Sequence, residues 1–234
     1  MRRIECAAIA LLLLFAAAFG LHIVSKSRTF QFFGRITSHV TTDRKVVALT
    51  FDDGPTTYTN EVLKTLSEKN TVATFYVTGS GLEQYPEIGT SIVEQGHEMG
   101  NHSYSHSRFI FKSQNYIDSE INRTNALIRD AGFESEITFR PPYGKKLFGL
   151  PWYLMNHNIQ TVTWNIEPDS YGSDSEFIVR YTVDNIENGS IILLHPFCES
   201  CNGKRAAIPE IIDALRARGY EFVTVSELLK FNQD

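Results

Sequence analysis

Short apolar runs alternate with longer segments of helical periodicity from Val46 towards the end of the chain. The runs are rich in β-branched and aromatic residues, which favour strands. We predict strands at Val46–Phe51, Thr71–Val77, His97–His102, Glu136–Arg140, Gln160–Ile166, Ser190–His195 and Glu221–Val225. Between them, apolar residues recur three or four positions apart, which is typical of amphipathic helices. We predict helices at Glu61–Lys69, Pro86–Gln95, Asn115–Asp130, Leu150–Asn156, Ser175–Asn188 and Ala207–Arg218.

The alternation of strand and helix predicts a parallel sheet, with a helix leading from each strand to the next. Ser190–His195 is almost continuously apolar, as expected for a strand buried on both faces. Seven strands are predicted, one fewer than the eight of a closed (β/α) barrel. We therefore expect an α/β fold, a distorted (β/α) barrel with about seven parallel strands in a single domain.

The N-terminal segment has a different character from the rest of the chain. Arg2-Arg3 precedes an uncharged, mostly apolar run from Cys6 to Val24. As a helix this run would be about 28 Å long, close to the hydrocarbon width of a bilayer. Ala16-Ala17-Ala18 also offers the small residues of a signal-peptide cleavage site. We expect a signal peptide or membrane anchor at 1–28, a spacer at 29–44 and an exported catalytic domain at 45–234.

Charge and cysteine content narrow the classes of partner and compartment. The net charge of −5 argues against a nucleic-acid partner. Cys198 and Cys201 form a Cys-x-x-Cys motif without a second cysteine pair. In an exported domain this favours a disulfide over a redox or zinc motif. The oligomeric state is left open.

Polar residues gather where the predicted strands end. Because the carboxyl ends of parallel barrel strands meet on one face, we expect these residues to form one site. They are Asp52 and Asp53, His102 and His106, Arg140, the stretch Trp164 to Tyr171, and His195. Asp-Asp-Gly-Pro alone is typical of a surface turn, but its coincidence with the other clusters favours a functional site.

Two of these histidines indicate a metal centre. His102 and His106 are four residues apart, one helical turn, so both imidazoles can face one point. Two imidazoles and one carboxylate suit a catalytic Zn²⁺, where three protein ligands leave a position for water. Co²⁺ or Mn²⁺ could occupy the same ligands.

Four short motifs occur in the order seen in polysaccharide deacetylases, carbohydrate esterase family 4, which the chain resembles from about Lys45 to Leu229. The motifs are TFDDG at Thr50–Gly54, NHSYSH at Asn101–His106, RPPYG at Arg140–Gly144 and LLH at Leu193–His195. The family fold is a distorted (β/α) barrel, in agreement with the strand count. Four motifs in order form a more specific signal than any one of them.

The resemblance implies a division of labour between the two adjacent aspartates. Asp53 would bind the metal together with His102 and His106. Asp52 would be the general base, held by Arg140. One carboxylate would thus bind the metal while the other remains free to accept a proton from water.

The resemblance also implies the groups that act on the other side of the scissile bond. The backbone N–H of Tyr143 would stabilise the oxyanion, and His195 would protonate the leaving amine. The family usually has an Asp-Trp pair after the fifth strand, whose Asp orients this histidine. Here the best register places Ser170-Tyr171 on that pair, so the partner of His195 is open, with Asp169 and Glu167 as candidates.

Three functions are consistent with these residues. The first is a metal-dependent hydrolase that removes N-acetyl groups from N-acetylglucosamine units of peptidoglycan, chitin fragments or an exopolysaccharide. The second is an O-acetyl esterase acting on a glycan such as acetylated xylan. The third is a glycan-binding module with a decayed site. The presence of every metal-site and base residue disfavours the third.

Overall fold

The computed structural model describes residues 2–232, so Met1 and the last two residues of the predicted catalytic domain lie outside it. The strands are β1 Ile36–Thr37, β2 Val46–Gly54, β3 Thr74–Val77, β4 Glu98–Asn101, β5 Thr161–Val162, β6 Ile191–Leu194 and β7 Glu221–Phe222. The helices are α1 Arg2–Ser25, α2 Thr59–Glu68, α3 Gly79–Gln84, α4 Pro86–Glu94, α5 Gln114–Asp130, α6 Gly149–Asn156, α7 Ser175–Asn185, α8 Asn202–Ala217 and α9 Val225–Leu229, with short 3-10 turns η1 Pro142–Gly144 and η2 Pro168–Ser170.

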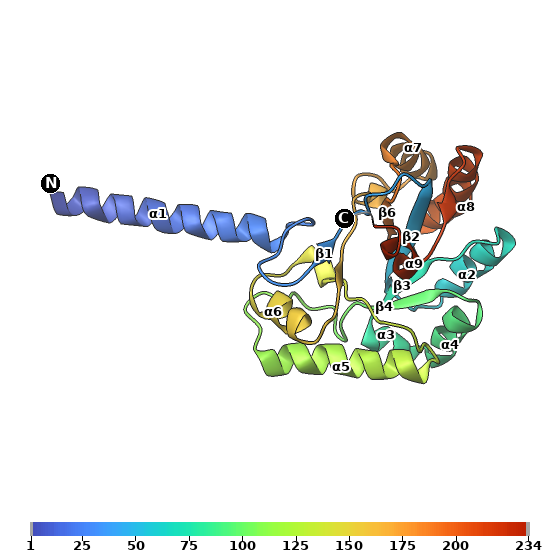
Figure 1. Cartoon of the computed structure of the whole chain (residues 1–234), viewed down its shortest axis with the longest axis horizontal. Coiled ribbons are helices and arrows are strands. Elements are labelled where there is room, and N and C mark those ends of the chain that lie inside the picture. The colour runs from blue at the N-terminus through green and yellow to red at the C-terminus, as the bar shows by residue number, and fades with distance from the viewer. Residues whose placement is uncertain (1, 233–234) are drawn as a thin grey trace.

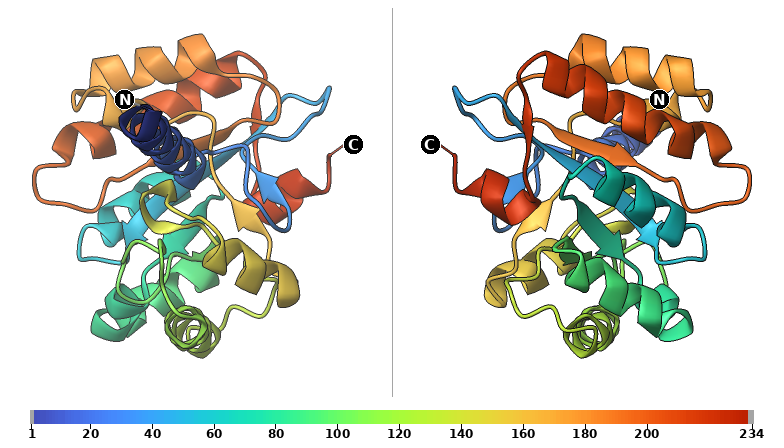
Figure 2. Two further views of the ribbon diagram at one scale, coloured as in Figure 1. Left: turned by 90° about the vertical axis from the view of Figure 1, so that its left-hand side faces the viewer. Right: turned by 90° about the vertical axis from the view of Figure 1, so that its right-hand side faces the viewer.

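The sheet is parallel and is centred on β2, as the alternating pattern predicts. Its order is β4-β3-β2-β6, and β7 pairs with the start of β2. Isolated parallel bridges continue the ring from Asn101 through Phe139 to Thr161, and from Ile166 back to Ile192. The result is a distorted, incompletely hydrogen-bonded barrel with the helices packed around the strands (Figure 2).

Alternation along β2 separates two apolar cores. Val47 and Leu49 belong to the core between the sheet and the outer helices. Val46 and Ala48 belong to the core inside the barrel. Because side chains on a strand alternate between faces, Asp52 continues the inward row. The sequence pattern thus directs this carboxylate into the mouth of the barrel.

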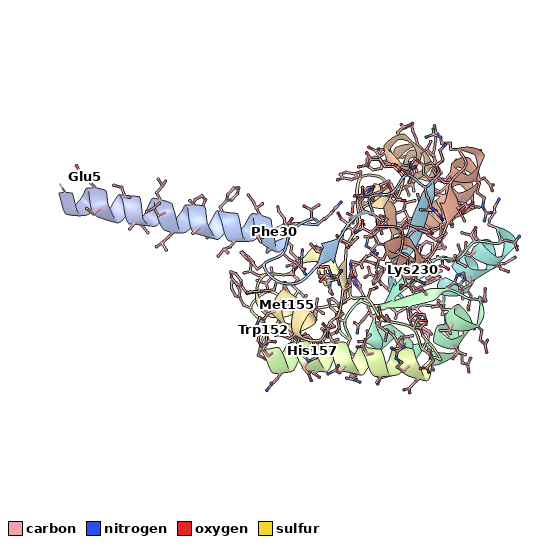
Figure 3. The ribbon with its side chains drawn as sticks, viewed as in Figure 1. Glu5, Phe30, Trp152, Met155, His157 and Lys230 are labelled. Carbon is pink, nitrogen blue, oxygen red and sulfur yellow. A yellow bond between two sulfur atoms is a disulfide. The ribbon has the colours of Figure 1, made fainter. Side chains whose placement is uncertain are left out.

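The N-terminal helix α1 projects away from the barrel (Figure 1). Its run Leu11–Phe15 is exposed, with Phe15 at 73%. Phe30 lies near its base, and Trp152 and Met155 lie on α6 on the same side of the barrel (Figure 3). Within residues 2–232, no helix combines the length and apolar character needed to cross a membrane.

The chain after α1 packs on the barrel. The Lys146 backbone N–H donates to the Ser25 carbonyl at 2.9 Å. In the predicted spacer, β1 pairs in parallel with β5, and Val40 is fully buried. Residues 25–40 are therefore part of the folded unit.

Several predicted elements differ from the observed ones. The predicted strand Glu136–Arg140 is wrong, because only Phe139 makes sheet-like bridges there. The last predicted strand ends early, because Thr224 and Glu227 form a capping box that starts α9 at Val225. Helix α3 was not predicted, because its sequence GSGLEQ lacks an apolar period.

His97 is a buried group that should make stability depend on pH. It is 5% exposed, its ring centre lies 5.3 Å from that of Phe75, and it has no hydrogen-bond partner among the described protein groups. Burial lowers the pKa of His97 from 6.5 to about 4. Between these values the unfolded chain binds the proton more readily, so stability falls as pH drops below about 6.5.

Between pH 7 and pH 5, we predict that the free energy of unfolding falls by about 2 kcal/mol less in His97→Phe than in the wild type. Urea unfolding of both proteins at several pH values measures this. At pH 8, where the histidine is neutral in both states, the comparison reports packing alone. Parallel pH profiles for the two proteins would contradict the prediction.

Candidate active site

A β-bulge at the end of β2 lets adjacent aspartates reach one site. The predicted strand ends at Phe51, but β2 continues to Gly54, and its register against β3 shifts between Asp52 and Gly54. Asp53 is the extra residue, with φ of 73°. A bulge re-aims a side chain that would otherwise point to the opposite face. Gly54 is required there, because a Cβ atom would lie 2.8 Å from the Phe197 ring.

Arg140 fixes Asp52 from inside the barrel. Its guanidinium is fully buried and donates to Asp52 Oδ1 at 2.7 Å and to Thr50 Oγ1 at 2.8 Å. The other terminal nitrogen donates to the Thr163 carbonyl at 3.0 Å. The guanidinium also lies 3.8 Å from the centre of the Tyr76 ring. The predicted Asp52–Arg140 pairing is thus present, in a dry and crowded setting.

His102 and His106 meet, but not through a helical turn. The predicted turn is wrong, because residues 102–106 form a loop in which Ser103 and His106 have φ of 66° and 55°. The Asn101 side chain accepts from the Ser103 N–H at 2.7 Å, and Glu120 accepts from the Ser105 N–H at 2.8 Å. These bonds hold the loop so that the two imidazole centres lie 4.9 Å apart.

The donor atoms of Asp53, His102 and His106 fit a metal ion. They all lie within 4.8 Å of one another, and Asp53 Oδ1 is 3.1 Å from His106 Nε2 and 3.5 Å from His102 Nε2. His102 Nδ1–H donates to the Arg140 carbonyl at 2.7 Å, because a carbonyl can only accept. This bond leaves Nε2 free to bind a metal, the usual arrangement for ligating histidines.

The local electrostatics also favour a cation at this cluster. Burial raises the pKa of Asp53, but hydrogen bonds and charge from His102 and His106 outweigh it and hold the pKa well below its ordinary value. Asp53 is therefore a carboxylate at neutral pH. Nitrogen and oxygen donors of this kind suit Zn²⁺ and related divalent ions.

The open question about His195 is answered by Asp169. The Asp169 carboxylate is fully buried and accepts from the His195 backbone N–H at 2.7 Å. It also lies 3.3 Å from His195 Nδ1. Burial lowers the pKa of His195, but the hydrogen bond and charge of Asp169, with the charges of Asp52 and Asp53, raise it to about 9. His195 is thus protonated at neutral pH, and its Nε2 remains free.

The other candidate, Glu167, serves a different purpose. Its Oε2 accepts from Trp164 Nε1 at 2.8 Å and from the Arg28 guanidinium at 2.5 Å. The Arg28 carbonyl accepts in turn from Thr163 Oγ1 at 2.6 Å. These contacts seat the segment after α1 against the site. Trp164, predicted as a core residue, is both buried and part of the pocket wall.

One pocket of about 480 Å³ collects the predicted residues. Asp52, Asp53, His102, His106, Tyr143 and His195 line it; Arg140 lies beneath it, behind Asp52. Tyr143 is 55% exposed, has φ of 57°, and its ring lies 4.5 Å from that of His106. The predicted disulfide Cys198–Cys201 is also present, in the loop after His195.

Sequence reasoning missed three residues that support the site. Lys204 Nζ lies 3.1 Å from Asp169 Oδ2. Thr50 holds Arg140, and Arg28 lines the pocket. Only Thr50 carried a signal, because it lies two residues before Asp52 on the same strand face. Lys204 and Arg28 lie in segments whose position depends on the completed fold.

This geometry defines a metal-dependent hydrolase built on a parallel α/β barrel. Residues 39–162 match the family model for polysaccharide deacetylase. The chain belongs to the polysaccharide deacetylase family, whose members are metal-dependent. The resemblance inferred from the motifs is thereby confirmed.

The chain is similar to enzymes that act on peptidoglycan. A peptidoglycan-N-acetylglucosamine deacetylase of Bacillus cereus is 32% identical over 85% of this chain and 94% of its own length. The peptidoglycan-N-acetylmuramic acid deacetylase PdaC of Bacillus subtilis is 33% identical over 80% of this chain and 39% of its own length. A crystal structure of a peptidoglycan N-acetylglucosamine deacetylase superposes with a TM-score of 0.79 at 28% identity, over 84% of this chain and 94% of that one.

We predict that Arg140→Met destabilises the protein by about 3–5 kcal/mol, because it leaves the Asp52 carboxylate buried without its partner. Urea unfolding of the metal-free protein measures the loss. Arg180→Met is the matched control, since the Arg180 side chain is 61% exposed and its contact with Glu176 is long, at 3.9 Å. This change should cost less than about 1 kcal/mol. Equal losses in the two variants would contradict the burial argument.

Proposed function

We propose that this chain removes N-acetyl groups from N-acetylglucosamine units of a polysaccharide, with peptidoglycan as the favoured polymer. One observation carries the proposal. A carboxylate fixed by a buried arginine, a three-residue metal cluster and a protonated histidine all face a single pocket. Amide hydrolysis needs a base, a stabilised oxyanion and an acid for the leaving nitrogen, and the pocket offers a group for each.

Asp53, His102 and His106 would hold the metal, for which we propose Zn²⁺, with Co²⁺ or Mn²⁺ as substitutes. When bound, such an ion lowers the pKa of water and polarises the substrate carbonyl. The His102 Nδ1 bond to the Arg140 carbonyl keeps the ring oriented for this task.

Asp52 would accept a proton from the attacking water. Arg140 fixes Oδ1, which leaves Oδ2 on the side of His102, at 3.6 Å from its Nε2. The base is therefore placed beside the metal cluster without belonging to it. The backbone N–H of Tyr143 would stabilise the oxyanion. Tyr143 has a left-handed backbone conformation, and its ring lies 4.5 Å from that of His106, beside the metal cluster.

His195 would protonate the departing amine. Asp169 accepts its Nδ1–H, so the proton that can be transferred is on Nε2. The Lys204 ammonium at 3.1 Å helps to keep Asp169 ionised; burial raises the pKa of Asp169, but His195 and Lys204 bring it below its ordinary value. Asp169 thus takes the orienting role that Ser170-Tyr171 cannot fill.

We infer that the enzyme acts outside the cytoplasm, in the periplasm or at the cell surface. The disulfide Cys198–Cys201 favours an oxidising compartment. The exposed apolar run Leu11–Phe15 in α1 also supports export, because such a surface is normally removed or covered. The segment would act as a cleaved signal or as a membrane-associated anchor.

We predict that the metal-loaded chain releases acetate from N-acetylglucosamine oligomers, and that Asp52→Asn abolishes release while metal binding is retained. An O-acetylated xylan is assayed in parallel, and faster release from it would favour the esterase alternative. The metal content of both proteins is measured directly. Asp53→Asn is the matched control, because it should lose metal affinity as well as activity.

Unchanged acetate release by Asp52→Asn would remove Asp52 as the base. Release from neither class of substrate by the metal-loaded wild-type chain would contradict the deacetylase proposal and favour a decayed binding module.

We predict that kcat/KM falls as pH rises through about 9, because the acid form of His195 is then lost. Asp169→Asn removes the charge and hydrogen bond that raise this pKa, so the alkaline limb should move about 1–3 units lower. The exposed change Asp184→Asn on α7 should leave the limb in place. A limb that stays at the same pH in Asp169→Asn would contradict the assignment.

A further inference from the structure

Three basic residues from separate segments gather beside the metal cluster. Lys26 follows α1, and Lys145 follows η1; both line the pocket that contains Asp53 and His195. Arg108 follows the histidine loop, and its guanidinium lies 4.9 Å from the centre of the Tyr143 ring. The His106 ring lies 4.5 Å from the same tyrosine, so this tyrosine connects Arg108 to the metal cluster. Lys26 and Lys145 therefore line the pocket itself, and Arg108 borders it through the Tyr143 ring.

These cations differ from the other basic groups of the site. Arg28, Arg140 and Lys204 each have a carboxylate within 3.1 Å. Among the side chains that the structure describes, Lys26, Arg108 and Lys145 have no carboxylate within ion-pair distance. The excess of positive charge is local, since the whole chain has a net charge of −5.

Holding these charges together is unfavourable in the protein alone. Burial lowers the pKa of Lys145, and the charges of Lys26 and Arg108 lower it further. Like charges that face a pocket without a protein counter-ion are stabilised when an anion binds among them. Lys145 is half-buried in the pocket wall, so the anion would enter the pocket rather than remain in bulk solvent.

We propose that Lys26, Arg108 and Lys145 form a subsite for a carboxylate carried by the glycan, so that the enzyme prefers an acidic polysaccharide to a neutral one. The inference rests on the proposed deacetylase function and names the class of its substrate. In peptidoglycan strands without stem peptides the matching group is the lactyl carboxylate of the muramic acid that neighbours each glucosamine; where a stem peptide is attached, this carboxyl is an amide. A neutral chitin-like polymer offers no group for this subsite.

The other source of anions near these residues is a lipid surface. Lys26 is exposed at the base of α1, where acidic headgroups could reach it. The position of Lys145 in the wall of the same pocket as Asp53 favours the glycan. The two sources are separated by the experiment below.

The test compares three substrates with the metal-loaded chain. They are peptide-free peptidoglycan strands, the same strands with their carboxylates converted to methylamides, and neutral N-acetylglucosamine oligomers. We expect kcat/KM to be higher for the carboxylated strands than for the amidated ones. The double variant Lys26→Gln/Lys145→Gln should reduce that ratio about fivefold, mainly through KM, as should 0.5 M NaCl in the wild type.

Lys230→Gln is the matched control, because this exposed lysine lies outside the pocket (Figure 3) and should leave the ratio unchanged. Binding of the carboxylated and amidated strands to Asp52→Asn, measured by calorimetry, tests the subsite without turnover. Equal binding of the two strands, or an unchanged ratio in the double variant, would overturn the subsite. Loss of binding to vesicles of acidic lipid in the double variant, with an unchanged ratio, would overturn it in favour of the lipid surface. Failure to release acetate from any substrate, with preferential binding retained, would contradict the proposed function alone.

Discussion

The buried ion pair between Arg140 and Asp52 is the interaction on which the site depends. A guanidinium inside a barrel needs a partner for its charge and acceptors for its protons; Asp52 and Thr50 accept from one terminal nitrogen and the Thr163 carbonyl from the other. The pair therefore links β2 to the strand-like segment before η1 and to the residues after β5. The Arg140 carbonyl also accepts from His102, so the residue that fixes the proposed base also orients a proposed metal ligand. One buried side chain and its own backbone thus position both parts of the candidate site.

The second constraint is the set of left-handed backbone positions around the pocket. Asp53, Ser103, His106 and Tyr143 all have positive φ. Non-glycine residues adopt this region rarely, and such conformations persist where the surroundings determine them. Here the bulge in β2, the Asn101 and Glu120 contacts and the turn at η1 provide those surroundings. The loops that carry these residues are therefore held in place by contacts at the candidate site itself.

Much of the site could be predicted from the sequence because strand periodicity and motif order are local signals. The two-residue period of β2 directs Asp52 inward, and the ends of β4 and β6 place His102 and His195 on the same face, where Arg140 follows the isolated bridge at Phe139. The sequence did not show how Asp53 turns, because a bulge depends on register against β3. It predicted a helical turn for His102 and His106, because spacing alone cannot distinguish a turn of helix from a loop held by distant side chains. Asp169 and Glu167 were equivalent as candidates until the fold placed one at His195 and the other at Arg28.

The segment between α1 and β1 contributes directly to the pocket. Ser25 accepts from Lys146, and Arg28 closes one wall of the pocket through Glu167 and Trp164. Cleavage at Ala16–Ala18 would leave this wall intact, whereas a chain started at residue 29 would lack it. The predicted leader, residues 1–28, and the residues that line the pocket therefore overlap in sequence. Truncation past Ser25 would therefore remove Lys26 and Arg28 from the pocket together with the predicted leader.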